Sequence, residues 1–146
     1  MVIKFKKPGS RGFTLIELMV VVVILGILAA VLAPKIPTFL TKAKEGKTKG
    51  NLATLRSTLN IYYSDNDGLY PYDNLACLVP KYLKAIPDCA LPPYHAASNT
   101  VTNGTVVGNS DAGNWQYNKN DGNVGWGNIW VECTHNDCAG TGWSSF

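Results

Sequence analysis

A long apolar stretch near the N-terminus constrains this chain more than any other feature. From Phe13 to Ala33 the sequence runs through 21 residues, of which only Glu17 is ionisable. An α-helix rises about 1.5 Å per residue, so the stretch is roughly 31 Å long, which matches the hydrocarbon thickness of a bilayer. The sequence therefore predicts one helix able to cross a membrane.

Glu17 is the unusual residue in this stretch. A charged carboxylate in the middle of a membrane helix costs at least ~2.5 kcal/mol on insertion scales, so Glu17 needs a partner that offsets its charge. The segment before the apolar stretch is basic and ends in the small residue Gly12. Its basic residues are Lys4, Lys6, Lys7 and Arg11.

The string from Gly12 to Pro34, GFTLIELMVVVVILGILAAVLAP, closely resembles the N-terminus of type IV pilins and of the pseudopilins of type II secretion. The resemblance implies that a prepilin peptidase cuts between Gly12 and Phe13 and that the new Phe13 amine is then methylated. It implies that Glu17 offsets the N-terminal amine of a neighbouring subunit in a fibre. It also implies a bend at Pro34, with Gly26 and Pro34 bracketing a region that loses helical order in the fibre.

Two later strings, residues 62–71 and 78–87, resemble the helix exit and the linking segment of the same family. The implied fold is α+β, a long N-terminal hydrophobic helix with a small antiparallel sheet in the head. The expected divisions are a leader at 1–12, a helix at 13–64 and a head at 65–146. Within the helix, 13–33 is the membrane or fibre-core part and 34–64 is amphipathic.

The pattern after the apolar stretch supports this division. Leu52, Leu55 and Leu59 recur at helical spacing and predict one buried stripe. The turn formers at 65–68 predict the end of the helix, and the ligand spacing of an EF-hand calcium loop is absent there. The lysines around this helix are expected to form a solvated face. They are Lys42, Lys44, Lys47 and Lys49.

The head is predicted to contain two strands, residues 114–118 and 127–133, joined by a polar turn. A stretch rich in Ser, Thr, Asn and Gly, residues 97–111, is expected to be an exposed loop. The tryptophans are expected to cover the leucine stripe with one face of the sheet. They are Trp115, Trp126, Trp130 and Trp143.

The four cysteines, Cys77, Cys89, Cys133 and Cys138, are expected to form disulfides if the head is exported. Three connectivities are open, and the local pairs Cys77–Cys89 and Cys133–Cys138 are favoured. A zinc site using the segment Cys133–Cys138 and its His135 is the weaker alternative, so we expect no metal and no cofactor. His95 and His135 have no nucleophile beside them in sequence, and the chain is expected not to be an enzyme.

Charge excludes a nucleic-acid role. The formal net charge is +3, but four of the 13 basic residues precede Phe13, leaving nine against 10 acidic ones. Lysines also follow the apolar stretch, so charge asymmetry hardly decides the orientation in a membrane. The resemblance implies a cytoplasmic leader and an exported head.

The function expected from the sequence is that of a structural subunit of a type IV pilus, held in the inner membrane as a precursor and extracellular once assembled. Its expected partners are copies of itself, prepilin peptidase, the assembly machinery and, before assembly, membrane lipid. The alternative within the family is a pseudopilin that forms a periplasmic piston. Outside it, the alternatives are a membrane-tethered enzyme and a secreted binding module cut after Ala33.

Overall fold

The computed structural model describes residues 12–106, 108 and 110–146. The basic leader residues Lys4, Lys6, Lys7 and Arg11 lie outside the described residues. By their internal contacts the residues fall into two compact units, one ending at Pro37 and one running from Thr38 to Phe146.

Helix α1 spans Leu15–Leu32 and is apolar on every side. Gly26 lies within it without interrupting the helix. A 3-10 turn, Ala33–Lys35, follows and contains Pro34, and helix α2 then spans Ile36–Asp65. The change of helix type coincides with Pro34, which has no N–H to donate to the helical ladder.

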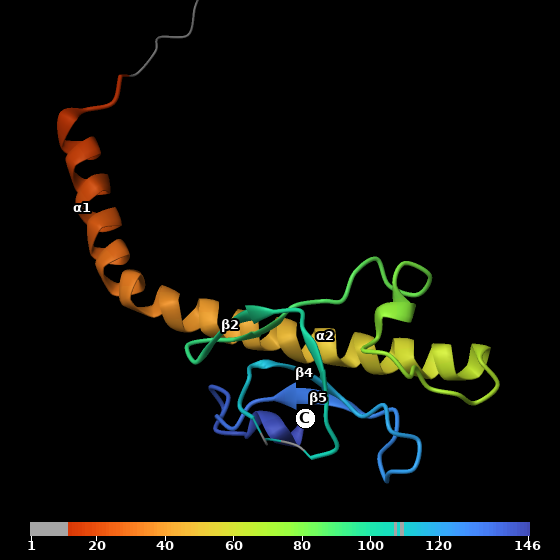
Figure 1. Ribbon diagram of the computed structural model, residues 1–146. Coiled ribbons are helices and arrows are strands. Elements are labelled where there is room, and N and C mark those ends of the chain that lie inside the picture. The colour runs from red at the N-terminus through yellow and green to blue at the C-terminus, as the bar shows by residue number, and fades with distance from the viewer. Residues whose placement is uncertain (1–11, 107, 109) are drawn as a thin grey trace, which may run out of the picture. The chain divides into compact units, whose positions relative to one another are not determined.

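Helix α2 supplies one side of the core of the second unit. Leu52, Leu55 and Leu59 are at most 3% exposed, which confirms the predicted stripe. They cluster with Trp115, Trp143 and other buried side chains of the head. Figure 1 shows strands β2, β4 and β5 alongside this helix.

The end of α2 follows the predicted turn. The N–H of Gly68 donates to the carbonyl of Tyr63 at 3.0 Å, which closes the last helical turn in the manner of a Schellman motif. Gly68 has a φ of +82° and Asp67 a φ of +53°, so the chain leaves the helix through the left-handed region. The segment is a helix cap.

Within the described residues, five short strands form two small sheets. Strands β1 (Cys89–Leu91) and β2 (His95–Ser98) pair antiparallel. Strand β4 (Asn114–Tyr117) lies between β3 (Val101–Asn103), which is parallel to it, and β5 (Ile129–Glu132), which is antiparallel. The head is thus α+β as predicted, with one parallel pair added.

The stretch 97–111 is not simply a loop. It contains the end of β2 and all of β3, and Val101 in β3 is only 8% exposed. Pairing with β4 explains the difference, because the strand reaches the sheet edge and buries one apolar side chain there. Residues 107 and 109 of this stretch lie outside the described residues.

The tryptophans divide between two environments. Trp115 and Trp143 join the leucine stripe in the core. Trp130 alternates with Ile129 and Val131, which face the core, so it lies on the opposite face of the sheet, where its indole N–H donates to Gln116. Trp126 packs edge-on against Tyr70, with 5.3 Å between the ring centroids.

Lys49 departs from the expected solvated face. Its Nζ lies 2.5 Å from Asp137 Oδ2 and 4.0 Å from the centroid of the Phe146 ring. The Lys49 ammonium lowers the pKa of the Asp137 carboxyl. The C-terminal segment packs on α2 at this point, which the lysine spacing alone does not reveal.

We predict that Leu55→Ala lowers the free energy of unfolding of the full chain in detergent by about 3 kcal/mol, because the side chain is fully buried. Ile61→Ala on the same helix is the matched control, since Ile61 is 54% exposed, and its effect is expected to stay below about 1 kcal/mol. Denaturant titration checks both variants. Equal losses would contradict the assignment of the buried stripe.

Candidate functional site

The surface of α1 is the largest apolar feature among the described residues. No residue of α1 is buried, and its large apolar side chains are 47% to 85% exposed. By length and composition this is the one helix suited to cross a membrane in the described part of the chain. A helix that is hydrophobic all round needs apolar surroundings, either lipid or other protein.

Glu17 has a partner within its own chain. Its Oε2 accepts hydrogen bonds from the backbone N–H of Thr14 at 2.8 Å and from the Thr14 hydroxyl at 2.7 Å. The Glu17 N–H donates in return to Thr14 Oγ1 at 3.3 Å. Thr14 is the N-cap of α1, so the two residues form a capping box.

This pairing was not predicted, although the sequence contains its pattern. Thr14 and Glu17 have the spacing of the S/T-x-x-E capping pattern directly before an apolar run. The expectation considered only a cation from a neighbouring subunit. The carboxylate is instead already hydrogen-bonded at the N-terminus of a helix, where the helix dipole favours a negative charge.

The expected cleavage position lies just before this cap. Gly12 and Phe13 precede the helix, and Phe13 is 83% exposed. Phe13 also lines a shallow hollow with one side of the first helical turns. An exposed dipeptide outside regular secondary structure is accessible to a peptidase, and Gly12 adds no side chain to obstruct it.

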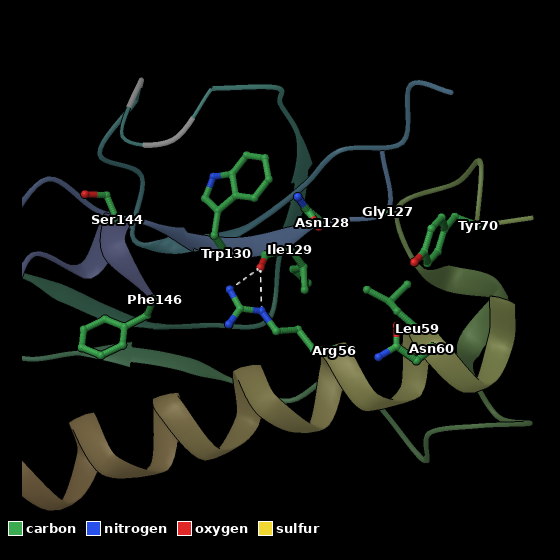
Figure 2. A pocket seen from close by; sticks show the side chains of 10 residues that line it. All are labelled: Arg56, Leu59, Asn60, Tyr70, Gly127, Asn128, Ile129, Trp130, Ser144 and Phe146. Atoms are coloured by element: carbon green, nitrogen blue, oxygen red, sulfur yellow. Dashed lines mark hydrogen bonds between the residues drawn. The ribbon is translucent and has the colours of Figure 1, made fainter. Parts of the chain in front are cut away.

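A cleft of about 350 Å³ lies in the head between α2, the start of β5 and the C-terminal residues (Figure 2). Arg56 crosses it and donates to the carbonyl of Ile129 from Nε at 3.3 Å and from Nη2 at 3.1 Å. None of the residues lining it is an acid, a histidine or a cysteine. Arg56 therefore links the helix to the strand, and we assign the cleft no chemistry.

The four cysteines are free thiols, and neither expected local pair is formed. Cys89 and Cys133 are buried in the core, whereas Cys77 and Cys138 are exposed. Burial, and secondarily the neighbouring Cys133, raise the pKa of the Cys89 thiol to about 12. Each expected local pair would join an exposed cysteine to a buried one, and closeness in sequence does not bring the two thiols together. Disulfide formation stays a prediction.

The two histidines come together with two other potential ligands. His95, Asp111, Cys133 and His135 place one donor atom each within 4.8 Å of one another. We call these four residues the His/Asp/Cys cluster. Cys138 does not belong to this cluster. Its backbone N–H donates to the Glu45 carboxylate at 3.1 Å.

The zinc site considered from the sequence used the segment Cys133–Cys138 with another ligand that was not identified. The sequence does not reveal His95 and Asp111 as ligands, because the chain returns to this point through β2 and through the turn before β4. Asp111 is held there by the N–H of Thr134, which donates to Oδ1 at 2.8 Å. This hydrogen bond is the main cause that lowers the pKa of the Asp111 carboxyl to about 2.

Comparison with known proteins identifies the N-terminal segment. Residues 7–33 match the family described as the prokaryotic N-terminal methylation motif. The chain is 39% identical over 74 residues to the type IV major pilin protein PilA of Myxococcus xanthus, covering 51% of this chain and 34% of the relative. It is 49% identical over 61 residues to the type II secretion system core protein G of Pseudomonas aeruginosa, covering 42% and 43%.

A third relative is the fimbrial protein EcpC of Eikenella corrodens, 37% identical over 70 residues, which cover 48% of this chain and 45% of the relative. The homologues are thus type IV pilins and core proteins of type II secretion, and the chain carries their N-terminal motif. In each case the match spans less than half of the relative's length. No solved structure is significantly similar to this chain.

We predict that Thr14→Ala weakens the start of α1 by about 1 kcal/mol, because the Glu17 N–H loses its acceptor. In micelles, hydrogen exchange at the Glu17 amide is expected to rise about fivefold. The amides of Val22 and Ile24, in the middle of the helix, serve as internal controls and are expected not to change. Unchanged exchange at Glu17 would contradict a functioning cap.

Proposed function

We propose that this protein is a structural subunit of a type IV pilus. The observation that carries the proposal is helix α1, whose apolar side chains are all exposed in the described chain. In the unassembled subunit, lipid covers this surface. In a fibre, the α1 helices of neighbouring copies cover one another.

Maturation on this proposal begins at the exposed Gly12–Phe13 bond. Prepilin peptidase removes the leader on the cytoplasmic side of the inner membrane, and the amine of Phe13 is methylated. The match to the N-terminal methylation motif supports both steps. The head is exported, and the assembly machinery of the inner membrane transfers the subunit into an extracellular fibre.

Glu17 then changes partners during assembly. In the single chain its carboxylate binds the N-cap at Thr14. Removal of the leader creates a cation at Phe13, and in the fibre the Phe13 amine of one copy pairs with Glu17 of its neighbour. Such a pair in an apolar interior fixes the register of adjacent helices. Gly26 and Pro34 supply the places at which the helix adapts to packing.

A second candidate is a pseudopilin of a type II secretion system, which forms a short periplasmic filament. The higher identity to the Pseudomonas aeruginosa core protein G, 49% against 39% for the pilin, favours this candidate. Deleting the gene distinguishes the two. Loss of surface fibres with normal protein secretion supports the pilus. Normal fibres, with normally secreted enzymes now trapped in the periplasm, support the pseudopilus.

We predict that the mature protein begins with a methylated Phe13. Mass spectrometry of the N-terminal peptide from native membranes checks both the residue and the added methyl group. A mature chain beginning at Pro34 would contradict the proposal, since it would identify residues 1–33 as a secretory signal peptide. Gly12→Leu is expected to leave the leader attached, because a large side chain replaces the small one at the cut site.

We predict that Glu17→Ala lowers the yield of fibres at least ~10-fold while leaving the subunit in the membrane. The lost charge pair removes the fixed register between helices. Glu17→Gln keeps the volume and a hydrogen-bond acceptor but not the charge, and it is expected to assemble poorly as well. Sheared-fibre yield and membrane level are measured together, and normal fibres from either variant would contradict a charge-pairing role.

A further inference from the structure

We infer that the His/Asp/Cys cluster is a binding site for one zinc-like divalent transition-metal ion. The ligand atoms are Nε2 of His95, Oδ1 of Asp111, Sγ of Cys133 and Nδ1 of His135. They come from β2, from the turn before β4 and from the residues that follow β5. This site lies in the head and is independent of the role proposed for α1.

The distances between donor atoms suit tetrahedral coordination. Zinc binds nitrogen and oxygen at about 2.0–2.2 Å and sulfur at about 2.3 Å, so donors in a tetrahedron lie roughly 3.3–3.6 Å apart. Asp111 Oδ1 lies 3.3 Å from His95 Nε2 and 3.3 Å from His135 Nδ1. Cys133 Sγ lies 3.5 Å from His135 Nδ1. These are three of the six donor pairs, and the remaining pairs lie up to 4.8 Å apart, so the side chains must draw together around an ion at the centre.

One ligand atom lacks a hydrogen bond. Nε2 of His95 is buried and makes no hydrogen bond to any described residue, whereas buried polar atoms almost always have a partner. Its contact with Asp111 Oδ1, at 3.3 Å, is an ion pair only when His95 is protonated. A metal ion shared by the two side chains gives the neutral ring a partner.

The surrounding residues fix the histidine rings. Gly113, at a φ of +66°, packs so closely on the His95 ring that an added Cβ would overlap it. Tyr94 stacks on His135 with 3.9 Å between the ring centroids and 9° between the planes. Asp111 is oriented by Thr134, as described above. Supports of this kind orient ligands around metals in proteins.

The donor set selects the class of ion. Two imidazoles and one thiolate favour zinc and similar transition metals, whereas calcium and magnesium prefer oxygen ligands. Four protein ligands leave no open position, as in structural zinc sites. The side chains of Asp111 and His135 are 34% and 35% exposed, so an ion can reach the site from solvent.

The geometry does not suit a catalytic Cys-His-Asp triad. In a triad the two ring nitrogens of the histidine contact the nucleophile and the acid separately. Here Nδ1 of His135 faces both Cys133 and Asp111.

The experiment uses the full chain in detergent under reducing conditions, stripped of metal and then titrated with zinc. We expect one zinc ion per chain by elemental analysis, with affinity measured against a chromophoric chelator. His95→Ala and His135→Ala are each expected to weaken zinc binding at least ~10-fold, as even the loss of an outer-shell partner does. Cys138→Ser is the matched control, and its affinity is expected to stay within about twofold of the parent.

Cobalt(II) tests the thiolate ligand separately. The parent is expected to show a sulfur-to-cobalt charge-transfer band that persists in Cys138→Ser and is absent in Cys133→Ser. Because Cys133 is buried, the circular dichroism of Cys133→Ser is compared with that of the parent, and His135→Ala provides a more exposed change at the same site. Zinc is expected to raise the Tm of the parent and leave that of His135→Ala unchanged.

Several results would overturn the inference. They are no zinc uptake by the parent at about 100 µM metal, the concentration at which the tighter extracellular calcium modules are half-occupied, and unaltered binding by both histidine variants. Loss of binding in Cys138→Ser would also overturn it. So would a Cys133 that mass spectrometry of the native protein finds in a disulfide, since a bridged sulfur is not a thiolate ligand.

Discussion

The rest of this structure depends on an apolar helix, α1, of which no residue is buried in the described chain. Burying one leucine, isoleucine or valine is worth about 1.5–3 kcal/mol. Helix α1 carries more than a dozen large apolar side chains, and none is buried in the described chain. Such a surface is incompatible with a solitary subunit in water, so the subunit requires lipid or other copies of itself. The proposed polymeric role is one way to meet this requirement, and membrane insertion is the other.

The head has a core of its own, which α2 supplies on one side through Leu52, Leu55 and Leu59. Lys49 and Arg56 add polar links from the same helix, one to Asp137 and one to the backbone of β5. The helix therefore serves as the foundation of the head as well as the continuation of the N-terminal segment in sequence. This explains why the compact unit begins at Thr38 and not after the helix ends.

Sequence patterns predicted the features that depend on local periodicity. The apolar run, the leucine stripe and the glycine-containing cap each arise from residues close together in the chain, and the structure confirms them. Among features that depend on distant residues, the packing of Trp115 and Trp143 on the leucine stripe was predicted, but others were not. The parallel strand β3 and the convergence of His95 and Asp111 on Cys133 arise from pairing between segments that no spacing rule connects. The missed capping box is different, because the Thr14–Glu17 spacing predicts it, but only an intermolecular partner was considered for Glu17.

The capping box gives the Glu17 carboxylate hydrogen-bond donors within its own subunit. A carboxylate that already holds two donors of Thr14 is compensated from the moment the helix forms. On the proposed function, unassembled subunits can then remain in a bilayer without an uncompensated carboxylate at Glu17. In the proposed fibre, Glu17 exchanges one satisfied contact for another, so the gain on assembly comes mainly from close packing between the apolar helices.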